Sequence, residues 1–369
     1  MAWFDIKNIA TVDSPSVVVY KERFVKNIQL ALQMVGGEAH RLIPHIKTNK
    51  MQEVVEAMVV QGIKKVKVST LAEAELAALS GMSSVLVAHQ LVGPKVARFF
   101  TLIQTFPQVT FSTIVDDRQI ATLLNEQAEK AGIKVEVYID INNGMNRSGI
   151  QLGAVLDQLI TQLTNCEHLQ LKGLHIYDGH HRDKDFTTRK QKIETDFAPV
   201  QALYEQLKVS YPTLTLIVGG TPAFTTHLQH QERICSPGTF VFWDVNYAEA
   251  LTEQQFHWAA LVVHRVISKP SEGIITTDLG HKAIAAEQPI DQRVRLLNPK
   301  GAYKLIKQSE EHGVWQVEHW EDYQVGDVLY GVPYHICPTI HLYEEVAVIE
   351  NHQKVDTWQV KARGRKISV

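Results

Sequence analysis

A lysine in a short basic segment is the most informative residue of this chain. Lys47 follows a brief apolar stretch that contains a proline, and Arg41, His45 and Lys50 are its basic neighbours in the sequence. A lysine amine beside other cations, or in a dry environment, loses its proton more easily, and a neutral amine can form a Schiff base. Lys47 is therefore a candidate covalent anchor for an aldehyde cofactor, although a solvated lysine in a basic loop would look the same.

Two glycine-threonine groups have the composition of phosphate-binding turns. They are Gly219-Gly220-Thr221 and Pro237-Gly238-Thr239. Glycines let backbone N–H groups approach an anion closely, and threonine adds a hydroxyl donor. Either group alone could be an ordinary turn. Both follow the last two strands of the barrel predicted below, where such barrels often bind phosphate, so we expect a phosphate site there.

Other candidate site residues also follow predicted strands. Arg147 lies in a glycine-rich loop and could be solvated or could give a cofactor a fixed charge. Tyr177 ends an apolar strand and could stack, hydrogen-bond or fill space. His180 and His181 are adjacent, so we expect only one of them to face a site, and a structural role is as plausible as a catalytic one.

A histidine and a cysteine form a dense cluster near the end of the chain. If the backbone there is extended, His335 and Cys337 point to the same face, and an imidazole with a thiolate suits zinc. Two ligands are too few for a structural zinc site, but they fit one that water or substrate completes. The alternative is a half-buried strand with a chance histidine and an inert cysteine.

Eight β-rich runs alternate with helix-like segments in the first two thirds of the chain. We expect strands at Leu42–Ile46, Lys65–Ser69, Ser84–Ala88, Val109–Ile114, Val135–Ile141, Leu171–Tyr177, Leu214–Val218 and Ile234–Phe242. A helix is predicted from Asp117 to a stop at Ala131-Gly132. The alternation predicts an α/β fold. A doubly wound open sheet would look similar, but the count of eight favours a (β/α)8 TIM-like barrel.

The pattern changes after about Asn246, where β-type segments predominate. We therefore predict a barrel over residues 13–247 and a smaller, mostly β domain over 248–369 that carries His335 and Cys337. Residues 1–12 are assigned to the second domain, although they could also cap the barrel. The predicted strands there are Trp258–Ser268, Gly273–Asp278, Val314–His319, Val325–Tyr330, Glu345–Glu350 and Asp356–Lys361.

Composition restricts the classes of function. The net charge of −3 over 369 residues gives no nucleic-acid signature, and no apolar run is long enough to span a membrane. Three widely spaced cysteines suggest no disulfide framework, which fits a reducing compartment. The N-terminus lacks a signal-peptide pattern. We expect a cytoplasmic protein that acts on a small molecule.

Together these motifs resemble the D-threonine aldolase and D-serine dehydratase family, pyridoxal-phosphate enzymes with the alanine racemase-type barrel. The segment from Pro44 to Lys50 carries the most specific similarity. The others, in the expected order, are Asp140 to Arg147, Tyr177-Asp178-Gly179-His180, the two glycine-threonine groups, Ser309 to Gly313, and Pro333 to Thr339. Asn49 and Tyr334 depart from the family's common histidine and asparagine.

The resemblance implies a role for each matched residue. Lys47 would hold pyridoxal 5'-phosphate as a Schiff base, and Arg147 and Tyr177 would lie beside its ring. Gly219, Gly220, Thr221, Gly238 and Thr239 would hold its phosphate. His335 and Cys337 would bind a divalent metal, with zinc favoured over Mn²⁺ or Mg²⁺. His180 would be the nearby acid/base, although the His180-His181 doublet leaves both histidines open. A homodimer is also implied.

The expected activity is cleavage or dehydration of a D-3-hydroxy amino acid. Cys337 favours dehydration, because a thiolate is a soft ligand that suits zinc, and the resemblance associates a His-x-Cys metal pair with the dehydratases of the family. Three alternatives remain open: an amino-acid racemase of the same fold, which would not need the metal pair, a non-catalytic pyridoxal-phosphate carrier, and a metal-only barrel hydrolase.

Overall fold

The computed structural model describes all residues from 1 to 369. The chain divides into two compact units. We call Ala31–Gly238 with Gly364–Val369 the barrel unit, and Met1–Leu30 with Thr239–Arg363 the β unit. The domain ranges predicted from the sequence stay a prediction.

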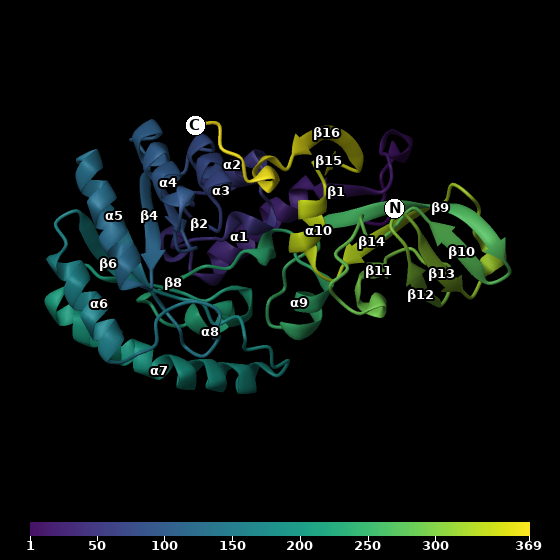
Figure 1. Cartoon of the computed structure of the whole chain (residues 1–369). Coiled ribbons are helices and arrows are strands. Elements are labelled where there is room, and N and C mark those ends of the chain that lie inside the picture. The colour runs from purple at the N-terminus through teal and green to yellow at the C-terminus, as the bar shows by residue number, and fades with distance from the viewer. The chain divides into compact units, whose positions relative to one another are not determined.

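The barrel unit contains seven parallel strands that pair in chain order (Figure 1). The strands are β2 (Lys65–Val68), β3 (Ser84–Val87), β4 (Thr110–Val115), β5 (Val135–Ile141), β6 (Leu169–Ile176), β7 (Thr215–Val218) and β8 (Arg233–Cys235). The helices of this unit are α2 (Gln52–Val60), α3 (Leu71–Leu79), α4 (Pro94–Thr105), α5 (Arg118–Ala131), α6 (Ala154–Asn165), α7 (Phe186–Ser210) and α8 (Phe224–His227).

An eighth segment joins the two edges of this sheet. Leu42 pairs with Cys235 of β8, and His45 pairs with Lys67 of β2, each through an isolated parallel bridge. We call Leu42–Ile46 the closing segment. It is not a regular strand, because Pro44 has no N–H to donate, although the Pro44 carbonyl accepts from Lys67 N at 2.9 Å. The predicted TIM-like barrel is confirmed, with its first strand reduced to these bridges.

The other predicted strands of the barrel are present with small shifts at their ends. β5 has the bounds that the sequence predicted. The last predicted strand, Ile234–Phe242, is much shorter, because β8 ends at Cys235 and a 3-10 helix begins at Thr239. Pro237 and Gly238 lie between the two, where a proline cannot donate to a strand ladder.

The predicted helix after Asp117 shows how local sequence sets element ends. The Asp117 carboxylate accepts from Gln119 N and Ile120 N at 2.8 and 3.0 Å, and so caps the first turn of α5. Gly132 ends the helix in the left-handed conformation at φ +66°. No helix of the chain has the length and apolar character that crossing a membrane requires.

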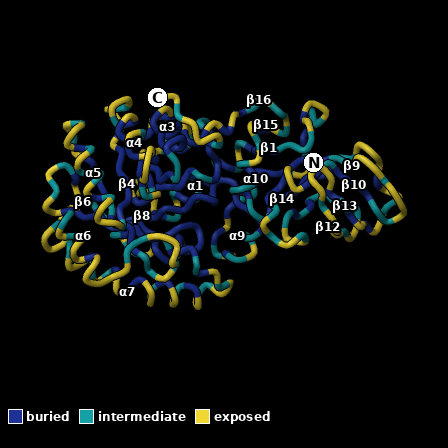
Figure 2. Tube along the Cα trace, in the orientation of Figure 1, coloured by how far each residue is buried: buried dark blue, intermediate teal, exposed yellow.

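Apolar side chains fill the barrel. Ile43 of the closing segment, Leu86, Ile114 and Ile217 are buried in one cluster. Figure 2 shows buried chain along the strands, while exposed segments lie along outer helices such as α7. The polar site residues therefore lie on a packed apolar base.

The β unit is built on a nine-stranded sheet, as the sequence predicted for this part of the chain. Its strands are β1 (Ser16–Tyr20), β9 (Ala260–Ser271), β10 (Ile274–Thr277), β11 (Val294–Leu296), β12 (Tyr303–Gln308), β13 (Gly313–Val317), β14 (Val328–Pro333), β15 (Glu345–Glu350) and β16 (Gln353–Gln359). Its short helices are α9 (Val245–Ala250) and α10 (Ile336–Leu342), and α1 (Lys21–Met34) begins in this unit.

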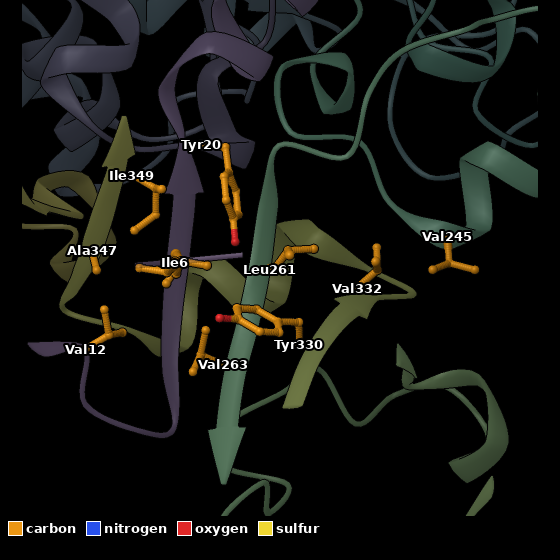
Figure 3. Packing of buried hydrophobic residues seen from close by; sticks show 11 residues of the cluster. Ile6, Val12, Tyr20, Val245, Leu261, Val263, Tyr330, Val332, Ala347 and Ile349 are labelled. Atoms are coloured by element: carbon orange, nitrogen blue, oxygen red, sulfur yellow. The ribbon is translucent and has the colours of Figure 1, made fainter. Parts of the chain in front are cut away.

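The N-terminal residues belong to the core of the β unit. β1 pairs with both β9 and β15 and was not predicted from the sequence. Ile6 and Val12 are buried in the same apolar cluster as Leu261 of β9. Figure 3 shows Ile6 surrounded by side chains from several strands, among them Tyr20 and Ile349. The first dozen residues are therefore structural parts of the β unit.

Truncating Leu261 to alanine should destabilise the β unit. Leu261 is fully buried, so the change removes apolar contacts and leaves a cavity, at a cost of about 2–5 kcal/mol in unfolding free energy. Ile267→Ala on the same strand is the matched control, because Ile267 is 41% exposed. Urea denaturation of both variants measures the effect, and equal costs would contradict the assigned core.

Candidate active site

Lys47 lies directly after the closing segment, on the 3-10 helix Ile46–Thr48. Its backbone N–H donates to His45 Nδ1 at 3.3 Å, and its Nζ lies 5.8 Å from the centroid of the Tyr177 ring. Tyr177 follows β6, so residues far apart in the sequence meet where the parallel strands end. This is the position in which barrel enzymes place their reactive groups.

The sequence neighbours of Lys47 are held by other partners. The Arg41 guanidinium donates to the carbonyls of Leu228 and His230 at 2.7 and 2.8 Å. The Lys50 ammonium forms a buried ion pair with Glu73. Burial, and then the charge of Lys47, holds the pKa of His45 well below its usual range, so His45 is a neutral imidazole. The crowding of cations expected from the sequence is thus mostly neutralised.

Arg147 meets Tyr177 from a loop that is fixed at its base. Arg147 Cζ lies 4.4 Å from the Tyr177 ring centroid, a cation–π distance. Below it, Asn142 N donates to the Ile150 carbonyl at 3.0 Å. Gly149 has φ +94°, and a Cβ there would lie 2.6 Å from Asn142 N, so only glycine fits. The predicted pair of Arg147 and Tyr177 is therefore brought together with Lys47.

The two turns predicted to bind phosphate meet in the barrel unit, and we call their residues Gly219, Gly220, Thr221 and Gly238 the cradle. A Cβ on Gly220 would lie 2.6 Å from Tyr177 Cε2, and one on Gly238 would lie 2.6 Å from the His45 carbonyl. The Gly238 N–H donates to Thr221 Oγ1 at 3.3 Å, and Gly219 has φ +72°. Such close approach requires glycine at positions 220 and 238. The Gly219 N–H donates to the Ile176 carbonyl at 2.9 Å, so the N–H groups of Gly219 and Gly238 both have partners within the chain. Thr239 belongs to the β unit.

A polar row under these groups contains a lysine that the sequence analysis missed. Lys67 points into the barrel from β2, and its Nζ donates to Ser236 Oγ and lies 3.3 Å from His175 Nε2. His175 Nδ1 lies 2.6 Å from Asp140 Oδ1. Lys67 Nζ is 5.8 Å from the Tyr177 ring centroid, the same distance as Lys47. We call Lys67, Ser236, His175 and Asp140 the polar row.

Burial sets the protonation of this polar row. Burial, followed by repulsion from Lys47, lowers the pKa of Lys67 to about 7. Burial and the Lys67 charge lower the pKa of His175. Burial acts to raise the pKa of Asp140, but the hydrogen bond with His175 outweighs it and lowers that pKa. At neutral pH the row therefore joins an ionised carboxylate, a neutral imidazole and an amine that exchanges its proton readily.

His180 and His181 lie in the loop between β6 and α7. The sequence suggested that only one would face a site, but their rings lie side by side, with centroids 4.0 Å apart. Both approach Asp196 of α7: His181 Nε2 is 3.3 Å and His180 Nε2 is 3.8 Å from Asp196 Oδ2.

The predicted metal pair lies at the start of a helix and not on an extended strand. β14 ends at Pro333, and His335 is the N-terminal cap residue of α10, whose first turn contains Cys337. The proline and the cap therefore replace the strand geometry assumed from the sequence. His335 Nδ1 lies 2.5 Å from Glu287 Oε1, and the Cys337 sulfur lies 3.7 Å from Thr239 Oγ1.

The surroundings of His335 fit a cation site. Burial acts to lower the pKa of His335, but Cys337 and Glu287 raise it to about 9. An imidazole placed between a thiol and a carboxylate is a donor set that suits zinc or another transition metal. Glu287 is thus a further candidate ligand, which the sequence offered no spacing signal to find.

Asn49 and Tyr334, the two residues that differ from the family pattern, both form hydrogen bonds. Asn49 is buried, and its Oδ1 accepts from Met51 N at 3.2 Å, while its Nδ2 has no hydrogen-bond partner. The Tyr334 hydroxyl lies 3.3 Å from an Arg295 nitrogen that donates to it. Asn49 therefore orders the turn after Lys47, and Tyr334 is fixed in the β unit.

Comparison with known proteins agrees with this geometry. Residues 19–245 match the family model of the alanine racemase N-terminal domain, and residues 259–349 match a serine dehydratase domain. The first match covers more than half of the chain, and the second begins at residue 259, after the first ends at residue 245. The chain belongs to the D-threonine aldolase and D-serine dehydratase family. The family consists of pyridoxal-phosphate lyases, so the chain is an enzyme of that class.

Curated relatives and solved structures match this chain over nearly its whole length. A D-threonine aldolase of an Arthrobacter species is 26% identical over 96% of this chain and 94% of its own length. A D-threo-3-hydroxyaspartate dehydratase of Delftia is 24% identical over 95% and 98%. The crystal structure of D-threonine aldolase from Filomicrobium marinum superposes with a TM-score of 0.85 at 25% identity, covering 98% and 99%.

Replacing Lys67 with methionine should change how stability depends on pH. The pKa of Lys67 is about 7 in the folded chain and about 10.5 when unfolded, so the unfolded chain binds more protons between these values. Wild-type stability therefore gains from rising pH in this window, by up to about 1.4 kcal/mol per pH unit from this residue. Lys67→Met lacks that gain, so its stability relative to wild type should fall from pH 7 to pH 10.

Chemical denaturation across this pH range measures the difference between variant and wild type. Lys65→Met is the matched control, because Lys65 is on the same strand but exposed. A difference that does not vary with pH would show that Lys67 is not a buried titrating amine.

Gly238→Ala should weaken cofactor binding. The added methyl group would meet the His45 carbonyl at 2.6 Å and push the closing segment away from the cradle. We expect affinity for pyridoxal phosphate to fall by about tenfold or more, equivalent to about 1.4 kcal/mol. Fluorescence titration measures the affinity. Gly364→Ala is the control, because a Cβ there meets nothing, and an unchanged affinity in Gly238→Ala would exclude the cradle.

Proposed function

We propose that this enzyme is a lyase of D-3-hydroxy amino acids that depends on pyridoxal 5'-phosphate and a divalent metal. The observation that carries the proposal is the meeting of the Lys47 amine, the Arg147 guanidinium and the Tyr177 ring. The cradle and family membership support it. Lys47 would hold the cofactor covalently, and Gly219, Gly220, Thr221, Gly238 and Thr239 would bind its phosphate.

Bound pyridoxal phosphate supplies an electron sink for negative charge at the substrate's Cα. The chain's own residues would then move protons. For dehydration, the Lys47 amine takes the Cα proton, and the products are a keto acid and ammonia. For cleavage, His180 takes the proton of the β-hydroxyl, and the products are glycine and an aldehyde. Arg147 gives the site a fixed positive charge in both cases.

His335 and Cys337 would hold the divalent ion, which acts as a Lewis acid on an oxygen of the substrate. The thiol favours zinc over Mn²⁺ or Mg²⁺, because a thiolate is a soft ligand. This ligand set favours dehydration over aldol cleavage. A solved structure of a D-threo-3-hydroxyaspartate dehydratase mutant is described as the metal-free form, which supports the use of a metal in the family.

Separate assay of the products would decide between the two reactions. Purified protein loaded with pyridoxal phosphate and zinc is incubated with D-threonine, D-serine and D-3-hydroxyaspartate. Keto acid and ammonia are expected in equal amounts, whereas glycine with an aldehyde would identify an aldolase. A chelator should abolish either activity, while a racemase would survive it. A cofactor carrier or a metal-only hydrolase would release no product from any of these substrates.

Lys47→Ala should lose both the covalent cofactor and the activity. Borohydride reduction of wild type followed by peptide mapping should label Lys47, because reduction fixes an amine-aldehyde link. The variant should lack the label and lose activity by at least about 10³-fold, the scale of removing a nucleophile. Lys65→Ala is the control, since Lys65 is exposed on β2. Label on another residue of wild type would refute the role of Lys47.

The homodimer and the cytoplasmic location are further proposals. The dimer follows from the resemblance to the family, and the location follows from the scarcity of cysteine. Analytical ultracentrifugation of the purified enzyme tests the first, and fractionation of the source cells tests the second.

A further inference from the structure

Three potential metal-ligating side chains of the barrel unit converge on one another. Ligand atoms of His180, His181 and Asp196 all lie within 4.8 Å of one another. The two histidines come from the loop after β6, and Asp196 comes from α7. None of the three belongs to the predicted metal pair His335 and Cys337.

The buried histidine of this cluster has an unused nitrogen. His181 is only 5% exposed, and its Nε2 has no hydrogen-bond partner, although it lies 3.3 Å from Asp196 Oδ2. His180 Nδ1 is also buried without a partner. Buried polar atoms are normally satisfied, so an orphaned imidazole nitrogen aimed at a carboxylate indicates a missing ligand. This observation is independent of the clustering itself.

Charge pairing around the cluster leaves Asp196 without a fixed cation. Asp178 is paired with His227 at 2.6 Å, and Asp183 is paired with Lys192 at 2.6 Å. Asp196 has only the two histidines beside it, and its side chain is 45% exposed. A bound cation would balance this carboxylate, and its exposure gives an ion from solution a path to the cluster.

The distances fit a transition-metal ion after a small movement. Ligands that lie about 2.0 Å from a tetrahedral ion are about 3.3 Å apart. The His181–Asp196 distance of 3.3 Å already has this value, and the His180–Asp196 distance of 3.8 Å must shorten by about 0.5 Å. Water would complete the coordination.

We propose that His180, His181 and Asp196 bind a divalent transition-metal ion, with zinc as the best-suited ion. Two imidazoles and one carboxylate are ligands that zinc accepts, and three protein ligands with water in the fourth position are a common zinc arrangement. The site has no thiolate, which separates it chemically from the site proposed at Cys337.

Occupancy of this site has a consequence that rests on the proposed function. An ion on His180 removes the lone pair with which that residue would take the β-hydroxyl proton in aldol cleavage. Zinc beyond the equivalent held by His335 and Cys337 should therefore inhibit cleavage to glycine and an aldehyde, and it should leave the dehydration route, in which Lys47 takes the Cα proton, unaffected.

Metal titration of a variant without the other pair tests the site. The full-length double variant His335→Ala with Cys337→Ala is freed of metal by chelation and titrated with zinc by calorimetry. One equivalent is expected to bind. Adding Asp196→Asn or His181→Ala should weaken this binding at least about tenfold, whereas Glu205→Gln, an exposed acid on the same helix, should leave it unchanged.

Asp196→Asn is the safer variant for folding, because Asp196 is partly exposed while His181 is buried. Cobalt in place of zinc gives a second readout: without Cys337, its spectrum should show bound ion but no thiolate charge-transfer band. The proposal is overturned if the double variant binds no zinc, or if Asp196→Asn and His181→Ala bind it as tightly as their parent. In either case His181 and Asp196 form a simple polar pair.

An activity measurement separates this site from the proposed function. Excess zinc should inhibit glycine formation by the enzyme that retains His335 and Cys337, and the same enzyme with Asp196→Asn should need at least about tenfold more zinc for equal inhibition. Equal inhibition of the two would refute the inhibitory role. Zinc binding that depends on Asp196 in a protein without lyase activity would refute the proposed function and leave the metal site standing.

Discussion

The active site depends on the closing segment, which has few hydrogen bonds of its own. Ile43 N donates to the Cys235 carbonyl and His45 N donates to the Pro237 carbonyl, each at 2.9 Å, while the Pro44 carbonyl accepts from Lys67 N on the other side. These bonds complete the barrel and set the direction in which Lys47 leaves it. The same backbone also explains why residue 238 is glycine, because the His45 carbonyl occupies the space of a side chain.

A second constraint is the buried amine of Lys67, which lies inside the barrel beside the closing segment. Lys67 is buried in a barrel that is otherwise apolar at its base, and it is tolerated because Ser236, His175 and Asp140 take up its hydrogen bonds and charge. Such a buried network is costly unless every member is satisfied. Its position beside the same tyrosine ring as Lys47 links the protonation of the barrel interior to the candidate site.

The sequence predicted those features that repeat or that have strong local signals. The alternation of strands and helices gave the barrel, and Asp117 with Gly132 gave the ends of α5. Lys47, Arg147 and Tyr177 were predicted and are brought together. Lys67 was missed because a lysine at alternate positions of a strand usually marks a solvated face, and only closure of the barrel turns that face inward. The sequence did carry one signal for this polar row: several predicted strands each contain one of its residues, namely Lys67, Asp140, His175 and Ser236.

Other features depended on geometry that no local pattern contains. β1 carries no turn signal that ties it to β15, more than 300 residues later, so its place in the nine-stranded sheet could not be read from neighbouring residues. The spacing argument for His335 and Cys337 applied only to an extended backbone, whereas β14 ends at Pro333 and a helix begins at Ile336. The approach of Asp196 to the two histidines depends on the packing of α7, whose residues have no sequence relation to the loop.

The loop that carries Arg147 has a fixed base, which we call the foot and which consists of Asn142, Gly149 and Ile150, and a largely exposed arc over residues 143–148. Asn142 N donates to the Ile150 carbonyl, Ile150 N donates to the Asp140 carbonyl, and the glycine required at position 149 holds the foot against β5. The Asn142 side chain accepts from Gly144 N and Asn146 N, so the arc above the foot is ordered from within. Arg147 therefore projects from a short arc whose shape does not depend on a bound molecule.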